Sequence, residues 1–222
     1  MADLHVVEHT ELVPYAEGVR MQEELRNAVQ AGESGDHLLL LEHEPVYTRG
    51  RRTGDGELPM GEQWYAAQGI EVCDADRGGA VTYHGPGQLV GYPILRLRGG
   101  VVGHLRAMAE GLAAVLAELG VTAVWRRDAP GLWVEPAGRP PAKICAFGVN
   151  VHRRVAIHGF ALNVTTALDA FDLIVPCGLR GVAVTSIAAF VPAPPLASLA
   201  ARAAELLGAA YGVTFAREEK KD

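Results

Sequence analysis

The sequence predicts an α+β fold with a mixed, largely antiparallel sheet and flanking helices. Short apolar runs typical of strands outnumber the stretches with helical spacing, and several of these runs are separated only by short turns. Hydrophobic residues make up 49% of the 222 residues, which is enough apolar mass for a sizeable core. Because strands and helices do not alternate regularly, the pattern argues against a parallel βαβ array.

The first half of the chain combines one helix with several strands. Residues 4–7 are expected to form a short strand and residues 15–29 a helix, since apolar residues recur there at helical spacing. The continuous apolar run 37–41 is typical of a buried strand, and the basic, glycine-rich stretch 49–60 is expected to be a loop. Further strands are expected at residues 70–73, 80–83 and 89–95.

The second half contains the clearest helix. Apolar residues keep helical spacing over residues 101–119, and Gly120 is expected to end that helix. Two strands, joined by the short segment 152–154, and a last amphipathic helix follow at residues 144–151, 155–164 and 196–211.

Length and charge narrow the class of protein. We expect one domain over residues 1–215 and a charged C-terminal tail over residues 216–222. The formal net charge is −6, whereas a non-specific nucleic-acid binder is normally basic. No apolar run approaches the roughly 20 residues that span a bilayer, and the first ten residues lack the pattern of a signal peptide. We therefore expect a cytoplasmic monomer that binds neither nucleic acid nor membranes.

The cysteines do not form a disulfide or zinc pattern. There are three, Cys73, Cys145 and Cys177, with no CxxC pair, and no histidines have a metal-binding spacing. Free thiols in a reducing compartment, and no metal, fit this set best. For Cys73 and Cys145 we expect the usual fate of a free cysteine, a small buried apolar side chain.

The sequence lacks the motifs of several common enzyme classes. No GxxxxGK[ST] phosphate loop is present, and the glycines after His84 miss the GxGxxG spacing by one residue. None of the three serines lies in a GxSxG motif, so a serine hydrolase of that type is not indicated.

Three segments carry candidate chemistry. In the first, residues 77–88 (RGGAVTYHGPGQ), paired glycines allow a close backbone approach to a ligand. Arg77 can meet an anion there, and His84 can form a hydrogen bond at the end of a strand. A glycine-rich hairpin without a ligand is the structural alternative.

The second segment holds a lysine at the start of an apolar strand. Lys143 is one of only three lysines, and the other two lie in the charged tail. Strand alternation would place Lys143, Cys145, Phe147 and Val149 on one face. A lysine there is expected to be partly desolvated, which lowers the pKa of its amine. The alternative is a side chain that extends to solvent at the strand end.

The third segment, residues 158–186, contains a cysteine between a proline and a glycine. Cys177 follows an apolar run at a turn, where a thiol can be exposed enough to react. A thiol near pH 7 needs a base, and a lysine can accept its proton and then stabilise the thiolate. The pair that the sequence offers is Cys177 and Lys143, with Cys145 as a rival nucleophile.

Together these segments resemble the octanoyltransferase family, the lipoyl(octanoyl) transferases. The matching stretches are RGGAVTYHGPGQ (77–88), KICAFGV (143–149), and HGFALNV through IVPCG to VTS (158–186), with LLLLEHEPVYTRGRR (38–52) upstream. The resemblance covers roughly residues 4–190. It implies a catalytic domain of the biotin- and lipoate-ligase type over residues 1–215.

The resemblance also implies residue roles. Cys177 would carry an acyl-thioester intermediate, and Lys143 would be its acid/base partner. Cys145 stands where a small residue such as alanine is usual. The acyl site would be lined by Arg77, Gly78, Gly79, Ala80, Val81, Thr82, Tyr83, His84, Ala146, Phe147, Gly148, Gly159, Phe160 and Ala161. Backbone N–H groups of Gly78, Gly79 or Cys177 are candidate oxyanion donors.

The family moves an octanoyl group from octanoyl-acyl carrier protein to a lysine of a lipoyl domain. The acceptors would be the lipoyl domains of 2-oxo-acid dehydrogenase complexes and the H protein of the glycine cleavage system. Thioester exchange is nearly balanced, so neither ATP nor a cofactor is expected. Basic clusters at residues 49–52, 126–127 and 152–154 are candidates for docking the acidic carrier protein.

Two other functions remain open on the sequence. An ATP-dependent lipoate or biotin ligase would share the fold, and residues 49–54 faintly resemble the adenylate loop of biotin ligases, but a ligase needs no cysteine nucleophile. A non-catalytic protein that binds lipoyl or acyl carrier domains would not require Lys143 and Cys177 together.

Overall fold

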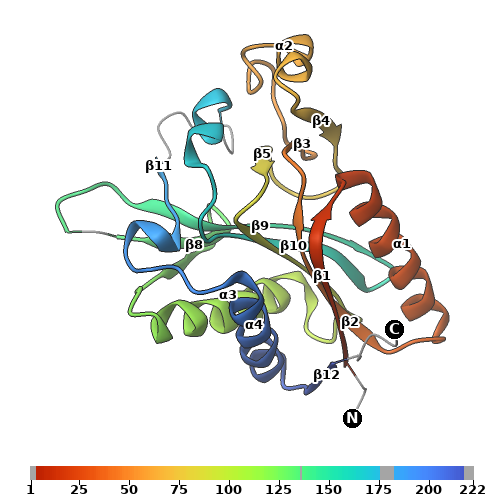
Figure 1. Cartoon of the computed structure of the whole chain (residues 1–222). Coiled ribbons are helices and arrows are strands. Elements are labelled where there is room, and N and C mark those ends of the chain that lie inside the picture. The colour runs from red at the N-terminus through yellow and green to blue at the C-terminus, as the bar shows by residue number, and fades with distance from the viewer. Residues whose placement is uncertain (1–3, 136, 176–182, 218–222) are drawn as a thin grey trace.

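The computed structural model describes residues 4–135, 137–175 and 183–217. Within these residues, nine strands form a large mixed sheet and three strands form a small one. Figure 1 shows helices on both faces of the large sheet and the small sheet beyond one end of it.

The large sheet has antiparallel strands at its centre and parallel pairs toward its edges. Its order is β12-β1-β2-β6-β10-β9-β8-β7, with β11 beside β9. Parallel pairing joins β1 to β2 and to β12, and β9 to β11. The strands are β1 (Leu4–Val13), β2 (Asp36–His43), β6 (Gln88–Ile94), β7 (Val124–Arg126), β8 (Gly131–Val134), β9 (Ala142–His152), β10 (Val155–Asn163), β11 (Ala183–Val184) and β12 (Phe215–Arg217). The predicted mixed, largely antiparallel α+β fold is confirmed.

Helices cover both faces of this sheet, which explains the continuous apolar run in β2. Leu38 and Leu40 pack in one core cluster with helices α3 (Gly100–Glu118) and α4 (Leu196–Tyr211). Leu39 and Leu41 point the other way and pack against α1 (Tyr15–Ala31). Since successive side chains of a strand alternate between faces, a strand covered on both sides needs apolar residues at every position.

Helix α3 is the most apolar helix of the described chain. By length and composition it could cross a membrane. Here its buried side packs against α4 and the sheet, as Met108, Leu112 and Leu116 belong to the core cluster. The three expected helices are all present, and Gly120, with a φ of 78°, follows the end of α3.

The small sheet forms a separate wall above the α1 face. It consists of β3 (Val46–Arg49), β4 (Glu71–Asp74) and β5 (Val81–His84). Helix α2 (Glu62–Ala67) and the 3-10 helix η1 (Leu168–Leu173) pack on it, and a second 3-10 helix, η3 (Ile187–Ala189), precedes α4. Aromatic rings form its core: Tyr47, Tyr65, Tyr83 and Phe171 contact one another edge-on or tilted.

Several short elements were not expected from the sequence: β3, α2, β7, β8, β11 and β12. They have two to six residues, and their pairing partners are set by long-range register that no local pattern shows. The expected domain boundary at residue 215 falls inside β12, because Phe215–Arg217 pair with Leu4–Val6. The hairpin between β9 and β10 turns through Arg153 and Arg154, both with positive φ, as the favoured two-residue turn requires.

Candidate active site

A cavity of ≈ 320 Å³ lies on the α1 face, between the large sheet and the small sheet. All residues expected to line an acyl site line this cavity except Gly78 and Tyr83; they are Arg77, Gly79, Ala80, Val81, Thr82, His84, Ala146, Phe147, Gly148, Gly159, Phe160 and Ala161. Gly78 binds to β9 beside the cavity, and Tyr83 packs in the aromatic core of the small sheet. Lys143 also lines the cavity, whereas Cys177 lies outside the described residues.

A β-bulge directs the lysine into this cavity. Leu132 of β8 pairs with Cys145, but the next residue, Trp133, pairs with Lys143, so Ile144 is an extra residue in β9. A bulge of this kind shifts the alternation of side chains by one position. Ile144 and Cys145 consequently pack together in the α3–α4 core, while Lys143 shares the opposite face with the cavity.

The prediction that Lys143 and Cys145 share one face is therefore wrong. Cys145 is fully buried in the core, and burial raises the pKa of its thiol well above the ordinary value. A thiol that is held protonated and enclosed is a poor nucleophile. The structure thus removes Cys145 as a rival. Cys73, on β4, is partly buried, and burial raises the pKa of its thiol to about 11.

Lys143 is held among protein groups instead of extending to solvent. Its side chain is 7% exposed, and its Nζ lies 4.9 Å from the centroid of the Trp133 ring. On the backbone, Lys143 pairs with Val184 of β11, and its carbonyl accepts a hydrogen bond of 2.9 Å from the N–H of Thr185. The side-chain nitrogen of Lys143 and the strand that carries it are both fixed beside the cavity.

A chain of hydrogen bonds connects the sequence motifs to that lysine. His84 and Gln88 are joined by a bond of 2.7 Å, and the Gln88 amide donates to the side-chain oxygen of Asn163 at 2.9 Å. The Asn163 amide then donates to the carbonyl of Thr185 at 3.0 Å, and the N–H of Thr185 reaches Lys143. Residues far apart in the sequence therefore position one another in a single buried polar network.

Arg77 is a structural residue of the cavity wall. Its guanidinium is buried and donates to the carbonyl oxygens of Gly78 and Ala80 and to both the carbonyl and the hydroxyl oxygen of Thr48. These bonds hold the Gly78–Gly79 segment onto the small sheet. The positive charge that was expected to meet an anion is directed at the protein's own oxygens.

Glycines allow the backbone of residues 78–79 to approach the backbone of β9 closely. The N–H of Gly78 donates to the carbonyl of Val149 at 3.0 Å, which removes Gly78 from the candidate oxyanion donors. A Cβ on Gly148 would lie 2.9 Å from the carbonyl oxygen of Gly78, so only glycine permits the approach. Gly79 has a φ of 93°, a conformation that other residues rarely adopt.

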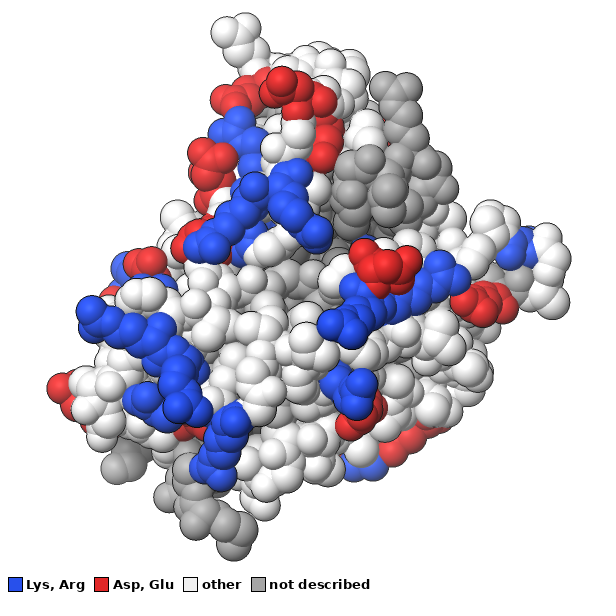
Figure 2. Space-filling view, turned by 180° about the vertical axis from the view of Figure 1, so that it is seen from behind, with Lys and Arg blue, Asp and Glu red and all other residues white. Residues whose placement is uncertain are grey.

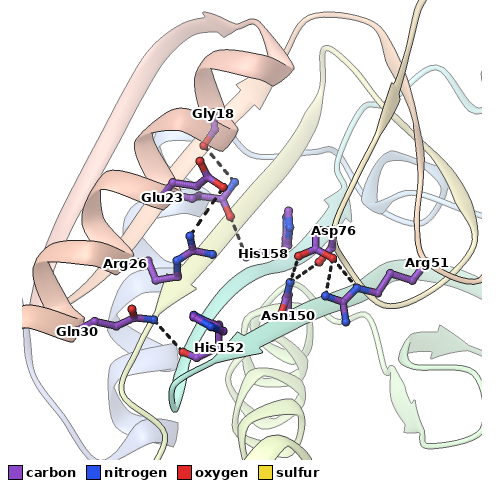
Figure 3. Close-up of polar contacts among 10 residues, drawn as sticks. Gly18, Glu23, Arg26, Gln30, Arg51, Asp76, Asn150, His152 and His158 are labelled. Carbon is purple, nitrogen blue, oxygen red and sulfur yellow. Dashed lines mark hydrogen bonds and ion pairs between the residues drawn. The ribbon is translucent and has the colours of Figure 1, made fainter.

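Polar contacts of the preceding residue, Asp76, also hold this segment against β9. Asn150 of β9 donates to the carbonyl and the carboxylate of Asp76, and Arg51 pairs with the same carboxylate. Figure 3 shows this cluster beside His158, with α1 on the other side. The N–H of His158 donates to the side-chain oxygen of Gln22 at 2.8 Å, which ties α1 to β10. His158 has a φ of 56°, a conformation unusual for a residue within a strand.

Small residues create the space inside the cavity. Ala146, Gly148, Gly159 and Ala161 occupy neighbouring positions on β9 and β10 and line it. The rings of Phe147 and Phe160 belong to the α3–α4 core on the other face of these strands. The apolar middle of the cavity is open because its wall has almost no side chains.

The closed end of the cavity is formed by residues that the sequence motifs did not indicate. Tyr15 of α1 and Tyr92 of β6 line it with His84 and His158, and His43 lies directly behind. Tyr15 stacks parallel to His84, with 6.1 Å between ring centroids. These residues come from separate elements, and only strand register and the position of α1 bring them together.

The imidazoles at this end are neutral near pH 7. Burial lowers the pKa of His43 and of His158 to about 4 and holds that of His84 well below its ordinary value. His43 Nδ1 must donate to the carbonyl of Val13, so its Nε2 accepts the hydroxyl hydrogen of Tyr92 at 2.6 Å. Neutral histidines can thus be buried beside the apolar middle of the cavity without the cost of a buried charge.

The segment that contains Cys177 is bounded by described residues on the cavity rim. Before it, the N–H of Val175 donates to the carbonyl of Glu57, whose residue lines the cavity. After it, Ala183 and Val184 pair with Ala142 and Lys143. Among the residues that the structure describes, no group of three His, Cys, Asp or Glu side chains could hold a metal ion.

Comparison with known proteins agrees with this fold. Residues 14–207 match the family model of the lipoyl protein ligase A/B catalytic domain. The bipartite lipoate protein ligase of Thermoplasma acidophilum superimposes with a TM-score of 0.75 over 100% of this chain and 88% of its own, at 16% identity. At that identity the likeness concerns the fold, which is the catalytic domain of the lipoyl protein ligases.

Within the class of proteins with this catalytic domain, curated relatives of higher sequence identity define the family. The octanoyltransferase of Clavibacter sepedonicus is 48% identical over 181 residues, which cover 79% of this chain and 75% of the relative. That of Acidobacterium capsulatum is 41% identical over 218 residues, covering 92% and 89%. The chain belongs to the octanoyltransferase family and is an acyltransferase.

Proposed function

We propose that this acyltransferase moves an octanoyl group from octanoyl-acyl carrier protein to a lysine of a lipoyl domain, through a thioester on Cys177. The observation that carries the proposal is the fixed position of Lys143. The lysine faces a cavity with an apolar middle, and described residues before and after Cys177 are held at that cavity, Val175 by Glu57 and Val184 by Lys143.

The reaction divides into two acyl transfers. In the first, Lys143 takes the proton of Cys177, the thiolate attacks the octanoyl carbonyl, and the carrier's phosphopantetheine thiolate leaves and recovers that proton from the lysine. In the second, the amine of the acceptor lysine attacks the Cys177 thioester. The C–S bond breaks as the amide C–N bond forms, and the proton released by the amine returns through Lys143 to the sulfur.

The lining of the cavity favours the binding of an acyl group of medium length. Its middle is lined by Ala146, Gly148 and Ala161, and each CH₂ group buried there is worth about 0.8 kcal/mol. An octanoyl group has six more CH₂ groups than an acetyl group, and these contribute roughly 5 kcal/mol before entropy costs. That difference favours octanoyl over acetyl groups.

Basic residues at the mouth support an acidic donor. Arg52 and Arg127 are exposed, and Arg52 also lines the cavity. Figure 2 shows basic side chains on more than one side of a hollow on this face. Arg49 and Arg51, in contrast, pair with carboxylates of the protein itself. We infer that Arg52 and Arg127 dock the acyl carrier protein.

Intact mass spectrometry tests the acyl-enzyme. After mixing with octanoyl-acyl carrier protein, the parent protein and Cys145→Ala should each gain about 126 Da, one octanoyl group in place of hydrogen, whereas Cys177→Ala should gain nothing. Addition of a lipoyl domain without ATP should then remove the group from the enzyme. An adduct that persists in Cys177→Ala would contradict the proposed nucleophile. Acylation that requires ATP and free octanoate would instead indicate a ligase.

The docking inference has its own test. Arg52→Glu should raise the KM for octanoyl-acyl carrier protein several-fold, more strongly at low salt, and should leave the KM for the lipoyl domain near the parent value. Arg98→Glu, the same change of charge at an exposed position just before α3, is the matched control. Equal effects of the two variants would exclude a specific role for Arg52.

A further inference from the structure

Glu57 is the one acidic residue that is buried among the residues that the structure describes. It lies in the loop between β3 and α2, is 7% exposed and lines the cavity. Burial of a carboxylate is much more unfavourable than burial of a neutral polar group, unless a cation or several hydrogen bonds compensate for it. A carboxylate in this position therefore needs a partner.

The protein itself supplies few partners to this carboxylate. One oxygen, Oε2, accepts a hydrogen bond of 3.1 Å from the N–H of Val81 at the start of β5. Within the described residues no group donates to the other oxygen, Oε1, and no ion pair includes Glu57. Oε1 is also not one of the unpartnered side-chain atoms that are closed off from solvent. One oxygen is thus fixed by the backbone, and the other is open to a ligand.

The basic side chains around the cavity do not pair with this carboxylate. The Nζ of Lys143 lies over the ring of Trp133, and the guanidinium of Arg77 donates to backbone and hydroxyl oxygens. Arg52 is exposed. The negative charge of Glu57 is therefore left for a cation that the described part of the chain does not supply.

Only one of the two substrates of the proposed transfer brings a cation to the reacting group. The donor presents a thioester on a phosphopantetheine arm, whose neighbouring polar groups are neutral amides. The acceptor is a lysine, and its side chain is protonated in solution near pH 7. After the transfer the same nitrogen belongs to an uncharged amide. A carboxylate therefore binds the substrate lysine more tightly than the octanoylated product.

We propose that Glu57 binds the side-chain nitrogen of the acceptor lysine through Oε1 and so serves the second acyl transfer. The inference rests on the proposed octanoyl transfer. The carbonyl of Glu57 also accepts the N–H of Val175, two residues before Cys177, which ties the same residue to the chain that leads to the proposed nucleophile. The bound ammonium releases one proton to solvent, and the resulting amine attacks the thioester. Its second proton returns through Lys143 to the sulfur.

Exchange of the carboxylate for an amide separates the two transfers. Glu57→Gln keeps an oxygen for the N–H of Val81 and removes the charge. Octanoyl-enzyme should form from octanoyl-acyl carrier protein at a rate within about twofold of the parent, as measured by intact mass. The KM for the lipoyl domain should rise about tenfold, with kcat within a few-fold of the parent, because a hydrogen bond between charged groups is lost. The thermal midpoint should equal or exceed that of the parent, because a buried charge is removed.

A nucleophile without charge distinguishes the binding of a cation from a general defect. Hydroxylamine is uncharged near pH 7 and takes the octanoyl group from the thioester as octanoyl hydroxamate, which frees the thiol. Its rate with the octanoyl-enzyme should be the same in Glu57→Gln and in the parent. Glu110→Gln, the same substitution at an exposed position of α3, is the matched control and should leave all of these measurements unchanged.

Three results would overturn the proposal. The first is an unchanged KM for the lipoyl domain in Glu57→Gln. The second is a slower formation of octanoyl-enzyme in that variant, which would indicate a role toward the donor. The third is a reaction with hydroxylamine that is slowed as much as the reaction with the lipoyl domain, which would indicate a structural role. If the parent protein forms no octanoyl adduct, the proposed function itself fails, so the two failures are distinguishable.

Discussion

The two faces of the large sheet differ in how side chains fill the space against the helices. On the α3–α4 face, Phe147 and Phe160 project large rings into a closed core, and the Phe160 ring lies directly over Gly91. On the α1 face, the neighbouring positions carry alanine and glycine, and a cavity remains. The same two strands thus build a solid core on one side and a binding site on the other. The difference depends on side-chain size at alternate positions.

Lys143 and Cys145 show this difference between the two faces within a single strand. They are two residues apart, yet the bulge at Ile144 puts them on opposite faces. The Lys143 side chain lies at the cavity, and the Cys145 side chain is buried in the core. The following experiments compare the two faces through matched substitutions.

The largest effect is expected from this pair of neighbours. Lys143→Met removes the proposed acid/base group and should lower octanoyl transfer to a lipoyl domain by at least about 10²-fold. Cys145→Ala should keep activity within a few-fold of the parent and lower stability by about 1 kcal/mol, because it leaves a small cavity in the core. Transfer is measured by the mass of the lipoyl domain and stability by urea unfolding. A comparable loss of activity in both variants would show that the division between the faces is not functional.

Acid should destabilise the protein through histidines on both faces. His43 and His158 on the cavity side and His104 on the core side all have a pKa of about 4, lowered by burial from 6.5. In the unfolded chain these groups take up protons below pH 6.5, whereas in the folded protein they do so only near pH 4. Stability is therefore full above pH 6.5 and falls as the pH drops toward 4, by up to about 3 kcal/mol for each histidine.

Urea unfolding between pH 7 and pH 4.5 measures this loss. His104→Gln, which removes one titrating group from the core face, should make the free energy of unfolding less dependent on pH. An unchanged slope in that variant would contradict the burial of a neutral imidazole at this position.

Close glycine contacts occur on both faces and give a third comparison. A Cβ on Gly148 would lie 2.9 Å from the Gly78 oxygen at the cavity, and one on Gly111 would lie 2.9 Å from the Cα of Leu207 between α3 and α4. Substitution of either by alanine should cost about 1–3 kcal/mol in unfolding free energy. Gly148→Ala should also reduce kcat, because it displaces the wall that includes Arg77. Gly111→Ala should leave kcat unchanged at temperatures where it is folded, and a reduced kcat there would contradict this separation.

The smallest effect is a gain in stability on the outer side of α3. Gly103 has open space around its missing Cβ and lies inside the helix, so Gly103→Ala should stabilise the protein by about 0.5–1 kcal/mol. Gly120→Ala, where φ is 78°, is the opposite control and should destabilise it. Thermal unfolding distinguishes the two. A loss of stability in Gly103→Ala would indicate that this side of the helix is not open.

Local sequence patterns predicted the elements that have strong periodicity. The helix around Leu112 and the buried strand with Leu39 follow from apolar spacing, because each presents a continuous face to a core. The motif segments also predicted most of the cavity wall. Lys143 was found because it is isolated among arginines, which is a feature of composition and not of local structure.

The rest of the candidate site depends on how the strands are aligned with one another, which no single sequence segment shows. The alternation argument for Cys145 assumed a regular ladder, and an extra residue in β9 is recognised only when its partners on β8 are known. Tyr15 and Tyr92 each look like ordinary core residues of a helix and a strand. A weak signal did exist, since His43 ends an apolar run and a buried imidazole requires a partner, which proves to be Tyr92.

The pairing of β1 with β12 has a consequence for how the protein is made. Residues 4–6 align in parallel with residues 215–217, so the edge of the sheet joins chain segments that leave the ribosome about 200 residues apart. Long-range parallel pairs form slowly, because their loop-closure entropy is lost before any contact compensates for it. During translation β1 can pair with β2 early, but its other edge stays open until residue 217 has emerged. We expect the nascent chain to expose that edge to chaperones, and to aggregation, while the residues between β1 and β12 are synthesised.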